Sequence, residues 1–234
     1  MQTARLWAGV IALAVGAASA SAFAKPIFLT PPDYDPKLLL PAPPLDGSPA
    51  AKAELSELES IEATRSNAEF AKALHDDETE NATIFEATIG DGFVFAKFPA
   101  TAKLMSEVRN DEKEAASAAK NLFLRNRPWI VEPALKTCAR SDPPQSSYPS
   151  GHATMGYAMA VVLGALVPEK AQAIMARANE YAENRLVCSM HYRRDIVAGE
   201  VLGTAVGVAL LHNTAFKADF DAAEQELRAA HLTQ

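Results

Sequence analysis

Residues 196–211 read IVAGEVLGTAVGVALL, an apolar run in which Glu200 is the only charged residue. Glycine recurs at every fourth position, at Gly199, Gly203 and Gly207, and small residues at this spacing let a second helix approach closely. A membrane-spanning helix needs about 20 apolar residues, so this shorter, charge-bearing run indicates a buried core helix instead. The stretch therefore predicts a protein built on closely packed helices.

Helical periodicity continues on both sides of this run. A capping box, Ser66 with Glu69 three residues later, predicts a further helix start. Gly90-Asp91-Gly92 breaks the pattern, 93–95 suggests a short extended piece, and the proline-bearing segment 127–151 is expected to be a long loop. The other expected helices cover 51–63, 99–124, 152–167, 169–188, 194–211 and 215–230. The sequence has no alternating β pattern and no internal repeat, so the fold class is predicted to be all-α, as a single domain.

The first 24 residues have the features of a secretory signal peptide. Arg5 precedes an apolar run over 6–18, and Ala22-Phe23-Ala24 forms a small-residue cleavage site. An N-terminal membrane anchor is the alternative, but the run is short for a span and no lipidation cysteine follows it. We expect a periplasmic or secreted protein that has no membrane insertion after cleavage of residues 1–24.

Residues 25–50 form a proline-rich segment. Eight prolines lie between Lys25 and Pro49, a density that disfavours both a helix and a central strand. Apolar residues at 27–29 and 38–40 are able to pack. We expect an arm lying on the helical domain, residues 51–234, or on a second subunit.

Charge and cysteine content exclude several functions. Once Arg5 is removed with the signal peptide, 21 Lys and Arg face 29 Asp and Glu, a net charge of −8. An acidic surface repels nucleic-acid phosphates, so no nucleic-acid partner is expected. Two cysteines, Cys138 and Cys188, are too few for a disulfide scaffold or a cysteine-rich zinc site. In an oxidising compartment they suggest one bridge.

Residues 149–152 read PSGH and lie directly before an expected helix. The first backbone N–H groups of a helix are unpaired and attract anions. Gly151 lets a ligand approach the backbone, and His152 stands at the mouth of this site. An ordinary helix start with Ser150 as its N-cap explains the tetrapeptide equally well.

Two further clusters carry basic and titratable residues. His191 and Asp195 are four apart and would share one face of a continuous helix, where a carboxylate can fix the histidine tautomer. Arg185 adds a planar group that matches phosphate oxygens. Lys120 and Arg127 bracket an expected helix end. Taken alone, His191, Asp195 and Arg185 could form an ordinary surface ion pair. Lys120 and Arg127 could be present only because basic residues are favoured at a helix C-terminus.

Together the three clusters closely resemble the class A bacterial acid phosphatases, of the type 2 phosphatidic acid phosphatase superfamily that also holds vanadium haloperoxidases. KNLFLRNRP at 120–128, PSGH at 149–152 and NRLVCSMHYRRD at 184–195 match ten of the eleven fixed positions of that pattern. The likeness extends to the proline-rich segment, to 77–81 and to Tyr148. The departure is Asn184, where the family has serine. If that serine donates to phosphate, the asparagine amide still can.

The resemblance implies a compact helical bundle that hydrolyses small-molecule phosphomonoesters and associates with itself as a homo-oligomer. Lys120, Arg127 and Arg185 would hold the non-bridging phosphate oxygens, completed by Ser150 and the backbone N–H of Gly151. Three cations can replace the magnesium ion that other phosphoryl-transfer enzymes use, so no metal and no cofactor is expected.

The two histidines would then divide the chemistry between them. His191, oriented by Asp195, would attack phosphorus to form a phosphohistidine. His152 would protonate the leaving oxygen and later take a proton from water. A vanadium-dependent haloperoxidase and a non-catalytic phosphate-binding module are the alternatives. If the motifs converge on one phosphate, Cys138 and Cys188 are brought together as well, and we expect them to form a disulfide.

Overall fold

The computed structural model describes residues 28–234, and the expected signal peptide at 1–24 lies outside them. Within that range the chain is all-α and forms no β-strand, as the sequence predicts. The α-helices are α1 (Pro36–Leu39), α2 (Pro49–Thr64), α3 (Asn67–Glu78), α4 (Glu86–Ile89), α5 (Pro99–Phe123), α6 (Pro128–Val131), α7 (Gly151–Leu166), α8 (Ala171–Val187), α9 (Arg193–His212) and α10 (Lys217–Ala229). Single 3₁₀ turns are η1 (Pro31–Asp33), η2 (Ala82–Phe85), η3 (Phe95–Lys97) and η4 (Pro168–Lys170).

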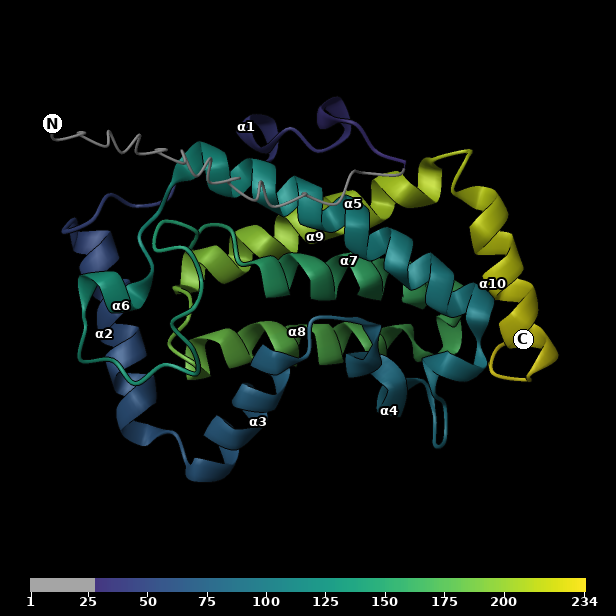
Figure 1. Cartoon of the computed structure of the whole chain (residues 1–234), viewed down its shortest axis with the longest axis horizontal. Coiled ribbons are helices and arrows are strands. Elements are labelled where there is room, and N and C mark those ends of the chain that lie inside the picture. The colour runs from purple at the N-terminus through teal and green to yellow at the C-terminus, as the bar shows by residue number, and fades with distance from the viewer. Residues whose placement is uncertain (1–27) are drawn as a thin grey trace, which may run out of the picture.

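Helix α7 is the centre of the bundle, with α9, α8 and α5 packed against it along the long axis of the molecule (Figure 1). The glycines of α9 face α7 at very short range. A Cβ added at Gly203 would lie 2.3 Å from the backbone oxygen of Thr154, and one at Gly207 would lie 2.8 Å from Val161 Cβ. The small residues predicted to allow close helix approach do so here.

Helix α9 is also the one helix among residues 28–234 that is long and apolar enough to cross a membrane by length and composition. Half of its apolar window is buried inside the protein, against α7 and α5. This is the pattern of a core helix, and it agrees with the reading of 196–211 from the sequence.

Helix ends follow local sequence signals. Ser66 caps α3 through the expected capping box, with reciprocal hydrogen bonds to Glu69. The extended piece expected at 93–95 is shorter than predicted: Val94 is extended, but Phe95 already opens the turn η3. Phe93 is held instead by ring contacts with Phe95 and Phe98.

The proline-rich segment packs on its own domain and is not fully extended. Pro36 stands at the first position of the one-turn helix α1, where proline is tolerated. The buried side chains of Leu29 and Tyr34 belong to the main core. Asp111 of α5 accepts hydrogen bonds from the backbone N–H groups of Phe28 and Leu29. The first described residues are therefore fixed against α5.

The segment between α5 and α7 is long, as expected, and contains only the single-turn helix α6. It lies at one end of the bundle, on the left of Figure 1, where α5 and α8 end and α7 and α9 begin. A disulfide joins Cys138 in this segment to Cys188 just after α8, as predicted. The chemistry-bearing motifs therefore meet at this end.

Candidate active site

A cavity of about 160 Å³ opens at this end of the bundle. Its lining includes five of the residues selected from the sequence: Lys120, Arg127, Gly151, His152 and His191. Lys120 comes from the last turn of α5, and the glycine and His152 come from the first turn of α7. Long-range packing thus brings all three motifs to one cavity.

His191 is held in one tautomer by two contacts. Its Nδ1 lies 2.8 Å from the backbone oxygen of Ser147, which can only accept, so Nδ1 carries the proton. Its Nε2 lies 2.8 Å from Nη1 of Arg127, which can only donate, so Nε2 presents a lone pair. Burial and nearby cations, Arg127 first among them, lower the pKa of His191 well below its ordinary value. The ring is therefore neutral and nucleophilic at Nε2.

Asp195 does not hold His191 in the way the sequence suggested. His191 precedes α9, whose N-cap is Tyr192, so the two residues do not share a continuous helix. Asp195 Oδ2 lies 3.5 Å from Nδ1, and the shorter contact of that nitrogen is the one with Ser147. The carboxylate accepts hydrogen bonds from the Ser147 hydroxyl and from the backbone N–H of Tyr192. Asp195 therefore positions His191 indirectly, by holding Ser147 and Tyr192 next to it.

Arg125 is a residue that the sequence motifs did not single out. It is buried, and its guanidinium bridges Asp195 Oδ1 at 2.5 Å and Glu54 Oε2 at 2.7 Å. It also stacks over the ring of Tyr192, with 4.1 Å between Cζ and the ring centroid. The negative charge of the buried Asp195 is thereby paired. No local pattern separates Arg125 from the neighbouring Arg127.

His152 is placed differently from His191. Its Nε2 lies 3.1 Å from the backbone oxygen of Asp77 and therefore carries the proton. Burial, followed by the charge of Arg185, lowers the pKa of His152 well below its ordinary value. The Nδ1 atom has no hydrogen bond to any residue in the described range, so it is the nitrogen free for proton transfer.

Lys120 and Arg127 line the cavity, whereas Arg185 does not line it but lies near enough for its charge to act on both of them. Burial and the nearby guanidinium of Arg127 lower the pKa of Lys120 to about 8, and burial lowers that of Arg127 to about 10. Arg185 is only 1% exposed and pairs with Asp77 through Nη1. Its Nε and Nη2 atoms are buried and find no hydrogen-bond partner within residues 28–234. Unpaired buried donors of this kind leave a place for an anion.

Ser150 and Gly151 form the start of α7. The Ser150 hydroxyl oxygen accepts a hydrogen bond from the backbone N–H of Ala153, so Ser150 is the N-cap of α7. The PSGH stretch is thus also an ordinary helix start. Its own N–H donates to the backbone oxygen of Asp195. A Cβ added at Gly151 would lie 3.5 Å from Lys120 Nζ, which shows how near the lysine comes to the helix start.

The side chain of Asn184 is bonded to α3. Its side-chain amide donates to Asp76 Oδ2 at 2.7 Å, and it does not line the cavity. Asp76 in turn pairs with Arg177. In this arrangement the residue anchors α3 to α8, and a hydrogen bond from Asn184 to phosphate stays a prediction.

Acidic side chains surround the cations. Asp77 lies in the last turn of α3 and Glu80 follows that helix. Glu112 lies on α5, and Asp142 lies in the long segment between α5 and α7. Asp142 Oδ2 pairs with Arg127 at 3.0 Å. Glu112 is fully buried, and this burial raises its pKa to about 7 although the neighbouring Arg109 acts to lower it. Apart from the 77–81 stretch, single-sequence patterns do not mark these residues.

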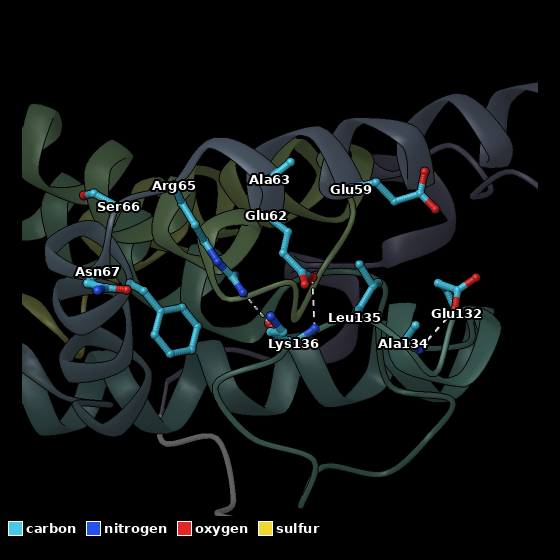
Figure 2. Close-up of a pocket in the computed structure, with 11 residues that line it drawn as sticks. Glu59, Glu62, Ala63, Arg65, Ser66, Asn67, Glu132, Ala134, Leu135 and Lys136 are labelled. Atoms are coloured by element: carbon cyan, nitrogen blue, oxygen red, sulfur yellow. Dashed lines mark hydrogen bonds between the residues drawn. The ribbon is translucent and has the colours of Figure 1, made fainter.

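A wider cavity of about 810 Å³ lies between α2, α3 and the segment 132–136 and holds none of the motif residues (Figure 2). Arg65 lines this cavity and donates to the backbone oxygen of Lys136 at 2.7 Å. It also donates to the backbone oxygen of Val187. The backbone N–H of Lys136 donates to Glu62. These contacts hold the long segment against α2 and the end of α8.

Among residues 28–234 no three His, Cys, Asp or Glu side chains gather as a metal site would require. Residues 113–218 match the family model described as the PAP2 superfamily. The chain is 30% identical to an acid phosphatase of Zymomonas mobilis over 206 residues, which cover 85% of this chain and 78% of the relative. It is 28% identical to a non-specific acid phosphatase of Salmonella typhimurium, over 80% of this chain and 78% of that protein. A non-specific acid phosphatase of Providencia stuartii is 28% identical over 62% and 60% of the two chains.

Proposed function

Since this chain belongs to the PAP2 superfamily and is an acid phosphatase, we propose that it hydrolyses phosphomonoesters by passing the phosphoryl group through His191. The observation that carries this proposal is the tautomer of His191. Its Nδ1–H is bound to Ser147, and its Nε2 lone pair lies at a cavity lined with cations. A neutral imidazole in that setting is an activated nucleophile.

In the proposed first step, His191 Nε2 attacks phosphorus and the bond from phosphorus to the ester oxygen breaks. The leaving oxygen keeps the electron pair and takes a proton from Nδ1 of the protonated His152. The Lys120, Arg127 and Arg185 cations hold the charge on the three remaining oxygens, the kind of stabilisation that phosphoryl transfer chiefly needs. His191 now carries the phosphoryl group on Nε2.

In the second step, water attacks phosphorus and gives its proton to Nδ1 of His152. The bond between phosphorus and Nε2 breaks, and the lone pair returns to His191. The low pKa values of both histidines in the free enzyme fit this cycle only if the bound phosphate, an anion, favours protonation of His152. Substrate charge thus supplies the protonated acid at mildly acid pH.

Rapid-quench labelling tests the intermediate. The enzyme is mixed with a ³²P-labelled phosphomonoester at mildly acid pH, and an acid-labile phosphoryl adduct should map to His191 by mass spectrometry. His191→Ala should abolish the adduct and the turnover, and His152→Ala should form the adduct slowly and retain it. His212→Ala, a change at an exposed histidine on α9, is the matched control. An adduct on any other residue would refute the assignment.

We also propose that the reaction needs no metal and that the protein is exported. Lys120 and Arg127, which line the cavity, and the nearby charge of Arg185 support the first point. The sequence of residues 1–24 supports the second. Activity should survive exhaustive chelation and fall in the presence of vanadate. N-terminal sequencing of the periplasmic protein should begin at Lys25. Loss of activity in chelator, restored by Zn²⁺ or Mg²⁺, contradicts the first proposal, and an intact residue 1 contradicts the second.

A further inference from the structure

A second, apolar cavity of about 220 Å³ continues the catalytic one. Both cavities are lined by α5, by α7 and by the segment after α3. Along each of these elements, neighbouring residues line first one cavity and then the other. On α7, Met155 faces the catalytic cavity and Met159, one turn later, faces the apolar one. On the segment after α3, Glu80 lines the first and residues 81–83 line the second.

Helix α5 gives the strongest sign of continuity. Its successive turns line the catalytic cavity from Lys120 back to Arg109 and the apolar cavity from Arg109 back to Ala102. Arg109 lines both. Its guanidinium is held on either side by carboxyl groups, those of Glu80, at 2.6 Å, and of Glu112. The two cavities therefore adjoin along α5, with Arg109 at their border, and together they are called the groove here.

The residues that line the apolar half of the groove, called the apolar half-groove below, suit an aromatic ring. Phe95, Met105 and Met159 are buried and present an apolar surface, while Ser106 and Thr83 form an exposed rim. Methionine sulfur makes favourable contacts with aromatic rings, and an apolar cavity of roughly 150 Å³ is known to hold benzene. A guanidinium at the border can stack on a ring face.

The distance between the two halves suits a small ester. Met159 follows His152 by seven residues on a continuous helix, which places the two about 10 Å apart along the axis at 1.5 Å per residue. A phosphoryl group, its ester oxygen and one aromatic ring fit within that span. The leaving oxygen would then lie beside His152, with the ring directed toward Met159.

We propose that this apolar half-groove is the leaving-group subsite and that the enzyme prefers phosphomonoesters of aromatic alcohols. The proposal rests on the proposed function for the identity of the reacting group. The ring lies among Met105, Met159 and Phe95, and Ala102 limits the depth of the site from α5. A polar alcohol gains nothing from the same surface.

Filling the subsite provides the test. Ala102→Leu adds bulk within the apolar half on a helix that tolerates leucine. It should lower kcat/KM for phenyl phosphate by about tenfold and change that for glycerol 1-phosphate by less than about twofold, within the range that a few methylene groups contribute to specificity. Ala96→Leu, the same change at an exposed alanine that does not line the groove, should affect neither. Ser106→Leu, on the exposed rim, provides a second variant with little risk to folding.

A binding measurement separates this proposal from the proposed function. Calorimetry with benzylphosphonate and methylphosphonate, which are not hydrolysed, should show tighter binding of the benzyl compound, and Ala102→Leu should remove that preference. If the preference holds while His191 proves not to carry phosphate, the subsite stands and the proposed mechanism fails. If the two phosphonates bind alike, or Ala102→Leu weakens both equally, the subsite is wrong whatever the mechanism.

Discussion

In the proposed mechanism, one hydrogen-bond donor decides which nitrogen of His191 is available to react. Because Arg127 donates to Nε2, that atom cannot carry the proton in the resting enzyme, and the Ser147 carbonyl takes the Nδ1 proton. When phosphate binds, its oxygens can accept from Arg127 in place of the histidine. In the proposed mechanism, this exchange would free the lone pair of Nε2 for attack on phosphorus.

Phosphate binding should raise the pKa of His152. In the free protein, burial and the charges of Arg185 and Lys120 keep the ring neutral through the mildly acid range. An oxyanion among those cations reverses part of this effect, and a rise of about one unit or more is expected for a charge at this range. Titration of ring-labelled histidine by NMR, with and without inorganic phosphate, measures it. The His152→Gln spectrum assigns the signal, and a pKa indifferent to phosphate would contradict the proposed acid.

Glu112 should set an upper pH limit on substrate binding. Burial raises its pKa to about 7 although Arg109 opposes that change, so Glu112 is neutral below this pH and negative above it. Glu80 and Lys120 are the other charged groups that act on it. The negative form repels a bound phosphate, and KM should therefore rise above about pH 7.

Glu112→Gln removes that titration. The KM profile of this variant between pH 5 and 8 should lie flatter than the wild-type profile, measured with the same ester. Glu59→Gln, at an exposed glutamate that lines the wider cavity on the α2 side, serves as the control and should keep the wild-type shape. Parallel profiles for Glu112→Gln and wild type would show that Glu112 does not act on the phosphate.

At the scale of elements, the pair α7 and α9 positions the reacting groups. The Ser150 N–H donates to the Asp195 carbonyl, so the start of α7 is bonded directly to the start of α9. The close approach along the glycines of α9 keeps the two helices in register behind this bond. A displacement of either helix moves His152 relative to His191.

Gly203→Ala should separate these helices. The new methyl group would meet the Thr154 backbone oxygen at 2.3 Å, which cannot move aside as a flexible side chain can. Overpacking of this kind costs about 1–3 kcal/mol of unfolding free energy. Gly164→Ala on α7, whose methyl group would lie 3.4 Å from Ala171 Cβ, is the control and should be neutral or slightly stabilising. Urea denaturation compares the two, and equal stability would contradict the tight α7–α9 contact.

At the scale of the whole molecule, the long segment between α5 and α7 is what completes the site. It carries Arg127, Asp142 and Ser147 and has little helix of its own. Its attachments include the disulfide to Cys188, the contact of Arg65 with Lys136 shown in Figure 2, and the hydrogen bond from the Tyr148 hydroxyl to Pro41 in the proline-rich segment. Residues far apart in the chain thus fix one wall of the cavity.

Removal of the disulfide should lower global stability. The bridge joins residues 50 apart, and the chain-entropy model gives a contribution of roughly 4 kcal/mol for a loop of that size. A Cys138→Ser, Cys188→Ser double variant should unfold at lower urea concentration than the oxidised protein. Reductant should affect only the wild type. Two titratable thiols in the denatured, unreduced protein from the periplasm would show that the bridge is absent there.

Local sequence was enough to predict the long helices and the all-α class, and to select candidate residues for the site, but it did not predict the one-turn helices α1, α4 and α6. Apolar periodicity, the capping box at Ser66 and the glycines of 199–207 are local signals, and each acts within a few turns of the chain. The three motifs likewise indicated Lys120, His152 and His191, through their likeness to a family of phosphatases. The extended piece expected at 93–95 is confirmed only at Val94, because Phe95 already begins a 3₁₀ turn.

Only the tertiary structure decided how those groups are held. The partner of His191 Nδ1 is a carbonyl 44 residues away, and the buried charge of Asp195 is paired by an arginine 70 residues away. Asn184 is turned toward Asp76, and the apolar half-groove arises where α5, α7 and residues 81–83 meet. Hydrogen bonds and cavities of this kind depend on which surfaces packing brings together, and that is a property of the folded chain as a whole.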